Sequence, residues 1–256
     1  MQGEGAESGA DRIRRKVRTH LTLIVAHRGD RAHAAENTLH AFESALSKGA
    51  EMIEMDLQLS ADGRVVVFHD LRLDELTSSH GTVREHTLAE LRTLAVRPER
   101  FTHHEDRCIP TLDEVLERIG DRCPLYLELK RAADDGTALA MAVLEIVGRD
   151  TPHVLASFDE ELVLLCRKAG RSTALIANDA RAAILAADRI GGLEALSLRL
   201  GEWSEQVLAE VTARSMRAWA WTVNDRRDWW RLQQLGVHAI CTDDPGAARG
   251  WREETP

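Results

Sequence analysis

Several ionisable side chains fall within or directly after short apolar runs of this sequence, where they could carry out acid–base and metal chemistry. Histidine titrates near neutral pH and can serve as a general acid or base. Carboxylate oxygens suit hard cations such as Mg²⁺ or Ca²⁺, and Arg and Lys suit phosphate. In combination these residue types predict metal-assisted hydrolysis of a phosphoester. The candidates are His27, Arg28, Glu54, Asp56, His69, Glu128 and Lys130.

Each candidate also has a simpler interpretation when it is taken alone. A single histidine at a strand end is more often structural than catalytic. Glu128 and Lys130 could form a surface ion pair that contributes less than about 1 kcal/mol. The catalytic interpretation depends on convergence, because burying two histidines, three carboxylates and two cations in one place costs free energy that stability does not require. We therefore expect the fold to bring these residues to one site.

The runs that carry these residues alternate between strand-like and helical patterns, which predicts βαβ units and a parallel sheet. Eight strands in 256 residues fit a (β/α)8 TIM barrel, an α/β fold whose active sites lie at the C-terminal ends of the strands. A doubly wound open sheet is the alternative, but no Gly-rich dinucleotide fingerprint follows the first run. The expected strands cover residues 21–26, 52–56, 125–129, 154–157, 173–176, 195–197, 218–222 and 239–242. The expected helices cover residues 38–48, 112–119, 138–147, 160–169, 180–187, 205–214 and 226–235.

An Asp62-Gly63 pair lies between two extended runs, and Asp-Gly in this position is a strong short-range signal for a β-hairpin. With a two-residue loop, Asp56 and His69 are directly opposed and their Cβ atoms lie about 4.5–5.5 Å apart. Glu54 shares the face of Asp56, because side chains alternate along a strand. The hairpin therefore predicts that these two carboxylates and His69 meet at the mouth of the barrel.

One domain can contain nearly the whole chain, since about 250 residues is near the upper size for a single hydrophobic core. We expect residues 1–20 to be a flexible N-terminal extension and residues 21–256 to form the barrel. The stretch 71–110 is too long for a plain loop and holds one helical pattern, at 88–94. We expect this stretch to be a small insertion over the barrel mouth.

The composition excludes several classes of protein. Hydrophobic residues make up 44% of the chain, which is too much apolar surface for intrinsic disorder. The formal net charge of −9, from 33 Lys+Arg and 42 Asp+Glu, argues against nucleic-acid binding. The sequence contains no run of about 18 apolar residues, which is the length that a membrane-spanning helix needs. The N-terminus lacks the apolar segment of a secretory signal, so we expect a cytoplasmic protein. The oligomeric state stays open.

The order and spacing of a set of short motifs resemble the glycerophosphodiester phosphodiesterase family. The resemblance runs from about residue 24 to residue 245, and the motifs are specific as an ordered set rather than one by one. They are His27-Arg28-Gly29, Glu36-Asn37-Thr38, Glu54-x-Asp56, Asp62-Gly63, His69-Asp70, Glu128-Leu129-Lys130, Trp221-Thr222-Val223-Asn224 and Cys241-Thr242-Asp243.

The resemblance implies a barrel that hydrolyses a small-molecule glycerophosphodiester to an alcohol and glycerol 3-phosphate. It implies that the catalytic residues are His27 and His69. It implies that the phosphate is contacted by Arg28 and Lys130, and that the substrate cleft is lined by Phe158 and Trp221. It also implies one divalent cation, Mg²⁺ or Ca²⁺, on Glu54, Asp56 and Glu128. Which histidine is the acid, and whether water or a substrate hydroxyl attacks, stays open.

Two departures from the family pattern bear on the substrate. The family proline before Glu36 is Ala35 here, which changes the stiffness of the loop rather than its chemistry. Glu75 stands in the region after His69-Asp70 where the family usually has an arginine. Any substrate contact of that arginine is missing, so the preferred head group can differ from glycerol.

Three other functions fit parts of the pattern. A lysophospholipase D acts on longer lipid diesters and would need an apolar groove or patch, whereas a small polar cleft would favour water-soluble diesters. A barrel that only binds a phosphorylated ligand is disfavoured, because every acid, base and metal position is filled. A sugar-phosphate isomerase or aldolase would instead depend on a Schiff-base lysine or a single carboxylate base.

Overall fold

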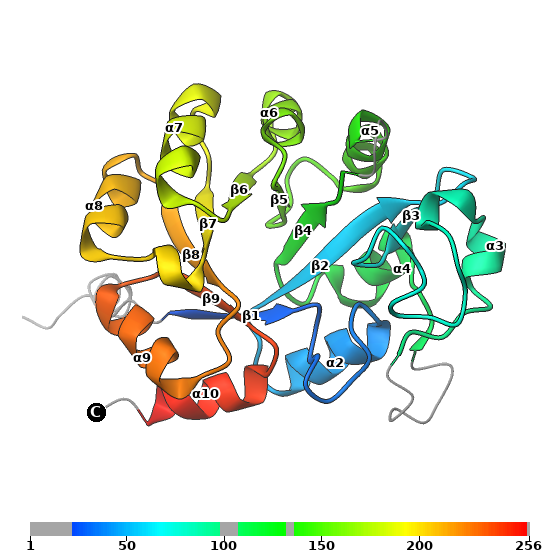
Figure 1. Ribbon diagram of the computed structural model, residues 1–256, viewed down its shortest axis with the longest axis horizontal. Helices are drawn as coiled ribbons and strands as arrows, with labels where there is room; N and C mark the ends of the chain where they lie inside the picture. The colour runs from blue at the N-terminus through cyan, green and yellow to red at the C-terminus, as the bar shows by residue number, and fades with distance from the viewer. Residues whose placement is uncertain (1–21, 98–106, 132–135, 255–256) are drawn as a thin grey trace, which may run out of the picture.

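Eight parallel strands close into a ring in the computed structural model, which describes residues 22–97, 107–131 and 136–254 (Figure 1). The ring closes because β1 pairs with both β2 and β9. This confirms the predicted (β/α)8 TIM barrel. The strands of the ring are β1 (Leu23–His27), β2 (Met52–Leu59), β4 (Leu125–Leu129), β5 (Val154–Ser157), β6 (Thr173–Ala177), β7 (Ala195–Arg199), β8 (Arg217–Trp221) and β9 (Ala239–Thr242).

Helices connect successive strands on the outside of the ring, and most begin at a side chain that caps them. Thr38, Asp159, Asp179, Ser204 and Asp225 each accept a hydrogen bond from a backbone N–H of the first helical turn, which satisfies donors that a helix start leaves unpaired. The helices are α2 (Leu39–Ser47), α4 (Leu112–Val115) with its π-helical continuation (Leu116–Gly120), α5 (Gly136–Ile146), α6 (Glu160–Lys168), α7 (Ala180–Ile190), α8 (Glu205–Ala213), α9 (Arg226–Leu235) and α10 (Pro245–Glu253).

The last helix, α10, was not among the expected helices. It begins at Asp244, whose carboxylate accepts from the N–H of Ala247, and it has Pro245 in its first turn. An acidic cap followed by proline is a helix start signal, since proline lacks the N–H that would be unpaired there. The sequence therefore carried the signal for this helix, but no long apolar stripe accompanied it.

The hydrophobic core has an outer layer, between the ring and the helices, and an inner layer that fills the ring. In the inner layer Tyr126 and Trp219 stack edge to face, with ring centroids 5.0 Å apart. Among the described residues, the charged side chains inside the barrel gather at the carboxyl ends of the strands, beyond this apolar layer. The inner layer comprises Val25, Met52, Tyr126, Val154, Ala156, Ala174, Ile176, Ala195, Trp219, Ala239 and Cys241.

The strand β2 continues past the ring and turns back as β3 (Val65–Val67), which lies outside the ring and is antiparallel to β2. The prediction of a two-residue hairpin loop is wrong, because the loop is one residue longer. Leu59 pairs with Val65, and the loop has three residues that end at Gly63, which has φ +75°. A turn closed by a left-handed glycine is the usual three-residue hairpin loop, so the same Asp-Gly pair produces a different register. Phe68, not His69, is therefore opposite Asp56, and its N–H donates to the Asp56 carbonyl.

The segment after β3 packs beside the hairpin and contains one turn of 3-10 helix (Val83–Glu85) and α3 (Leu88–Leu91). It has its own apolar cluster, which supports the proposal that residues 71–110 are an insertion on a single barrel domain, 21–256. The proposed extension 1–20 lies outside the described residues. The cluster contains Ala35, Val66, Phe68, Leu73, Val83, Leu91, Val96 and Ile109.

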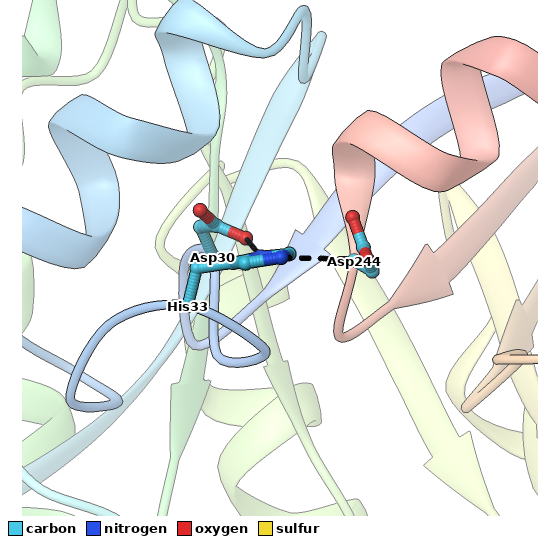
Figure 2. A group of neighbouring side chains, drawn as sticks. All are labelled: Asp30, His33 and Asp244. Carbon is cyan, nitrogen blue, oxygen red and sulfur yellow. Dashed lines mark hydrogen bonds and ion pairs between the residues drawn. The ribbon is translucent and has the colours of Figure 1, made fainter. Parts of the chain in front are cut away.

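The loop after β1 is fastened to the start of α10 by polar contacts (Figure 2). Buried Asp30 accepts hydrogen bonds from Ser44 Oγ at 2.6 Å and lies 2.9 Å from His33 Nδ1, and Lys48 Nζ is 2.6 Å away. The other ring nitrogen of His33 lies 4.0 Å from Asp244. Lys48 balances the negative charge of buried Asp30. The contacts of His33 with Asp30 and Asp244 bring the loop after β1 next to the start of α10.

Candidate active site

The C-terminal ends of the strands surround a cavity of about 150 Å³ that gathers the residues singled out in the sequence. Asp56 does not line the cavity itself but forms ion pairs with Arg28 and Lys130, which do. In the part of the chain that the structure describes, no helix is long and apolar enough to cross a membrane. The sequence-derived residues that line the cavity are His27, Arg28, Glu54, His69, Glu128, Lys130, Phe158 and Trp221.

Three carboxylates meet at one side of this cavity because of strand register. Glu54 and Asp56 project from β2, and Asp56 is directly paired with Glu128 of the neighbouring strand β4. One oxygen of each carboxylate lies within 4.8 Å of the others, and all three residues are buried. Three buried carboxylate oxygens at this spacing fit the coordination of a hard divalent cation.

The electrostatics of the carboxylates also fit a cation site. Burial and the charges of Asp56 and Glu128 raise the pKa of Glu54 well above its ordinary value. Burial and Asp56 likewise raise the pKa of Glu128 to about 7. Burial alone would raise the pKa of Asp56, but the charges of Lys130 and Arg28 hold it below its ordinary value. More negative charge is crowded here than two cationic side chains neutralise, and a divalent cation would balance it.

Arg28 and Lys130 both contact Asp56, Arg28 from the end of β1 and Lys130 from the end of β4, the two strands that flank β2. Lys130 Nζ lies 2.9 Å from Asp56 and 2.6 Å from Glu128. The guanidinium of Arg28 donates to Glu36 at 2.8 Å and lies 3.3 Å from Asp56, while its backbone N–H donates to Glu54 at 2.8 Å. Both side chains border the cavity, so an anion placed there would meet two fixed positive charges.

The backbone after β1 is shaped to present His27 and Arg28. Arg28 adopts a left-handed φ of +57°, and Gly29 follows with φ +84°. A Cβ on Gly29 would lie 2.7 Å from the backbone carbon of Ala41 in α2, so only glycine fits against this helix. The tight turn therefore explains the glycine of the His-Arg-Gly motif.

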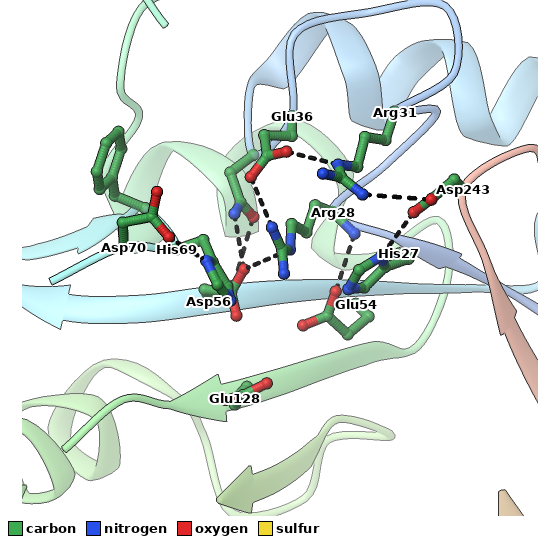
Figure 3. Close-up of polar contacts among 12 residues, drawn as sticks. His27, Arg28, Arg31, Glu36, Glu54, Asp56, His69, Asp70, Glu128 and Asp243 are labelled. Atoms are coloured by element: carbon green, nitrogen blue, oxygen red, sulfur yellow. Dashed lines mark hydrogen bonds and ion pairs between the residues drawn. The ribbon is translucent and has the colours of Figure 1, made fainter. Parts of the chain in front are cut away.

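Both histidines are oriented by a carboxylate (Figure 3). His27 Nδ1 lies 2.6 Å from Asp243, and His69 Nδ1 lies 2.6 Å from Asp70. The figure shows the two imidazoles on opposite sides of Arg28 and the carboxylates of β2. Burial lowers the pKa of both histidines below their ordinary value. With Nδ1 engaged, Nε2 is the nitrogen left to exchange a proton with a molecule in the cavity.

Aromatic side chains form the remaining wall. Phe158, just after β5, and Trp221, at the end of β8, pack edge to face with centroids 5.6 Å apart. The indole of Trp221 donates to the carbonyl of Ser197 at 3.1 Å, which fixes its ring, while 45% of the surface of Phe158 stays exposed. A bound molecule would therefore meet aromatic side chains as well as the charged groups that line the cavity.

A ring of charged contacts around His27 was not foreseen in the sequence. Asp243 accepts hydrogen bonds from Arg31 at 3.2 Å and Asn224 at 2.7 Å, and Arg31 donates to Glu36 at 2.6 Å. Glu36 in turn binds Arg28, so the contacts return to the residue next to His27. Asp243 directly follows β9, and its place at a strand end was the signal that could have identified it. Arg31 lies outside the motifs and offered no such signal.

The fold and the cavity define a (β/α)8 barrel enzyme with its polar groups at the carboxyl end of the ring. Residues 27–247 match the model of the glycerophosphoryl diester phosphodiesterase family. The chain belongs to this family, as its motifs indicated, and is a phosphoric diester hydrolase.

Relatives along most of the chain agree with this assignment. A glycerophosphodiester phosphodiesterase of Caldanaerobacter subterraneus subsp. tengcongensis is 30% identical over 88% of this chain and 95% of its own. The structure of an Oleispira antarctica phosphodiesterase in complex with the product sn-glycerol-3-phosphate superposes with a TM-score of 0.83 and 26% identity, and it covers 93% of this chain and 99% of its own. Lysophospholipase D GDPD3 of Mus musculus is 24% identical over 90% of this chain and 82% of its own.

Proposed function

We propose that this protein hydrolyses water-soluble glycerophosphodiesters to an alcohol and glycerol 3-phosphate, using one divalent cation and acid–base catalysis by His27 and His69. The observation that carries the proposal is the meeting of two carboxylate-bound imidazoles and three buried carboxylates at one cavity of about 150 Å³. Membership of the family supports glycerophosphodiester hydrolysis itself.

Glu54, Asp56 and Glu128 would hold the cation, since they offer only oxygen ligands, which suit Mg²⁺ or Ca²⁺. When bound, the cation supplies positive charge that stabilises a negatively charged phosphate in the transition state. Arg28 and Lys130 would bind the phosphate beside it, and their contacts with the carboxylates keep both side chains in place before the substrate arrives.

The two imidazoles would move the protons. One imidazole, neutral at the start, accepts the proton of the attacking hydroxyl while a new phosphorus–oxygen bond forms. The bond from phosphorus to the oxygen of the leaving alcohol breaks. That oxygen takes a proton from the other imidazole, which is protonated at the start. Attack by water gives glycerol 3-phosphate directly, whereas attack by the hydroxyl of the substrate gives a cyclic glycerol phosphate, whose ring P–O bond a water molecule must then break in a second step of the same kind. Asp243 and Asp70 support this exchange because each carboxylate fixes the tautomer and orientation of its histidine.

The cavity favours water-soluble diesters over lysophospholipids. It is small, and ionisable side chains are among its lining, including Arg28, Glu54, His69, Glu128 and Lys130. Among the described residues, Phe158 and Trp221 form the aromatic wall of this cavity, whose volume of about 150 Å³ is small for a long acyl chain. A long acyl chain would remain in water at the mouth, so little free energy would be gained from burying it.

The experiment is to assay the purified protein with glycerophosphocholine, glycerophosphoinositol and a lysophospholipid, each with Mg²⁺, with Ca²⁺ and with excess EDTA. We expect glycerol 3-phosphate from the water-soluble diesters with at least one cation, and only background release in EDTA. Turnover that EDTA leaves unchanged would remove the cation from the proposal. A protein that binds these diesters without turnover under any condition would be a phosphoester-binding barrel instead.

A further inference from the structure

The catalytic cavity adjoins a second, more open hollow of about 300 Å³ at the ends of β4 and β5. The two hollows have Glu128, Lys130 and Phe158 in common. A molecule held at the catalytic groups can therefore extend past Phe158 into this second hollow, which we call the outer groove. The outer groove adds three polar side chains to the shared ones, namely Arg131, Ser157 and Asp159.

The two hollows divide a diester into a constant and a variable half. Every glycerophosphodiester contains the same glycerol phosphate, and the enclosed cavity that holds the catalytic groups has a size suited to one small molecule. The alcohol on the other side of the phosphate differs from substrate to substrate. The more open outer groove is the place where alcohols of different shape can be accommodated.

Two carboxylates fix the position of the Arg131 guanidinium at the outer groove. Its Nη1 donates to Asp159 and, at 3.1 Å, to Glu161. Asp159 is itself fixed, because it caps α6 by accepting from the N–H groups of Glu161 at 2.8 Å and Leu162 at 3.2 Å. Among the described residues nothing accepts from Nε or Nη2 of Arg131, and 46% of its side chain is exposed. Arg131 lines the outer groove, so these nitrogens are available as donors to a ligand there.

The charges of the outer groove favour a neutral ligand. The charged side chains that line the groove are Glu128, Lys130, Arg131 and Asp159, two of each sign, so the groove presents no net positive charge to a second phosphate and no net negative charge to a quaternary ammonium ion. Hydroxyl groups can both donate to the carboxylates and accept from the guanidinium. The exposed ring of Phe158 offers a flat apolar face to the carbon skeleton of such an alcohol.

We propose that the outer groove binds the leaving alcohol and that Arg131 makes the enzyme prefer neutral polyhydroxy alcohols, such as inositol, over choline. The inference rests on the proposed function, because it concerns the second half of the same substrate. It assigns to Arg131 a role in substrate specificity and no role in the chemical step.

The test compares kcat/KM for glycerophosphoinositol and glycerophosphocholine in the wild type and in Arg131→Ala. We expect the wild type to favour the inositol diester, and Arg131→Ala to lower the ratio of the two kcat/KM values by about 10-fold, as for loss of a hydrogen bond from a charged donor. The change should come from KM, since the catalytic groups are untouched.

Arg189→Ala is the matched control. Arg189 is also an exposed arginine that binds a carboxylate of α6, Glu160, but it does not line the outer groove. Its replacement should leave the ratio within 2-fold of the wild type. Arg131→Lys, which keeps the charge but loses the forked donors, is measured in parallel and carries the test if the alanine variant does not fold.

Each outcome decides between the proposals. An equal loss for both substrates in Arg131→Ala, or no loss for either, overturns the assignment of Arg131 while the proposed function stands. A wild type that prefers the choline diester overturns the inferred ligand class. A wild type that hydrolyses neither diester with Mg²⁺ or Ca²⁺ fails the proposed function itself, and that result is obtained before any variant is made.

Discussion

The two histidines of the candidate site are held by different parts of the molecule. His27 ends β1, a strand of the closed ring, and its partner Asp243 is held in turn by Asn224 and Arg31. His69 follows β3, outside the ring, and its partner Asp70 is the next residue in the chain. The side chain of His27 is 15% exposed and that of His69 is 29% exposed. One histidine depends on contacts across the whole fold, and the other on a local hairpin.

This difference shows how a barrel can bring two imidazoles to one cavity from two different supports. Ring strands all run the same way, so their ends form a circle, and His27 takes its place there together with the carboxylates. The hairpin brings a second group over the mouth without a further barrel strand. Glutamine Gln58 secures it, since its side chain donates to the backbone carbonyls of Phe68 and Asp70 at 2.8 Å. The following variants test how far the two supports differ.

The largest effect is expected from removing either imidazole. His27→Asn and His69→Asn should each lower kcat by about 10²–10⁴-fold, because a proton transfer in the transition state is lost. Steady-state kinetics with a water-soluble diester measures the effect. His80→Asn serves as the control, since His80 is an exposed histidine that binds Asp74 away from the cavity. Full activity in His69→Asn would show that the hairpin supplies no catalytic group.

Glu128→Gln should change stability in a pH-dependent way in the cation-free protein. The pKa of Glu128 is raised from 4.5 to about 7 in the folded state, so the folded protein holds the proton more tightly than the unfolded chain does. Stability from this group is complete below pH 4.5 and is lost as the pH rises through 7. The glutamine variant should therefore gain on the order of 3 kcal/mol relative to the wild type between pH 4.5 and pH 8.

Urea denaturation in EDTA at several pH values measures this difference, in which the titration of groups remote from Glu128 cancels. Adding Mg²⁺ or Ca²⁺ should stabilise the wild type and not the variant, since a ligand that binds only the folded state raises its stability. An equal pH dependence in the two proteins would contradict the raised pKa of Glu128.

The partners of the two histidines allow a direct comparison of the supports. Asp243→Asn should lower kcat by roughly 10²-fold with little change in KM, because the amide no longer fixes the tautomer of His27. Burial would raise the pKa of Asp243, but its hydrogen bond to His27 and the charges of His27 and Arg31 lower it to about 2, so the carboxylate is charged at neutral pH. Asp70→Asn should cost roughly 10-fold, since Asp70 is more exposed. Equal losses would mean that the two supports are equivalent.

The smallest effect is expected at the hairpin loop. Gly63→Ala should cost about 1 kcal/mol, because Gly63 has φ +75° and alanine is strained there even though its Cβ would meet no atom within 4 Å. Gly170→Ala is the matched control, with φ +79° and equally open surroundings, but far from His69. Both variants should lower Tm by about 2–4 °C, and only Gly63→Ala should also lower kcat. An equal kcat would show that the loop does not govern the position of His69.

Much of the barrel could be predicted because the sequence repeats one local rule. Each apolar run is short and most helices start at a capping residue, so the eight strands and their helices follow from local patterns. The hairpin register could not be decided in this way, since Asp62-Gly63 is compatible with a two-residue and a three-residue loop. The one-residue difference leaves His69 beyond β3 rather than opposite Asp56, yet still at the mouth.

The gathering of the site residues was predictable for a similar reason, whereas their support was not. Strand ends of a closed ring meet on one circle, so His27, Glu54 and Glu128 had to be neighbours once the barrel was assumed. The bond between His27 and Asp243 joins residues 216 positions apart, and the contact of Arg31 depends on a loop with left-handed residues such as Asn37. No local pattern specifies such a loop, because its shape is decided by what packs against it.

The buried inner layer, which includes the edge-to-face pair of Tyr126 and Trp219, fills the interior of the ring. Substrate and products therefore pass through the mouth at the carboxyl ends of the strands. If the outer groove holds the alcohol, then the alcohol lies closer to solvent than the product that carries the phosphate. Departure is then ordered, with the alcohol first and the anion last. The phosphate monoester product should therefore compete with substrate for the cavity and inhibit the enzyme, whereas the free alcohol should inhibit it little.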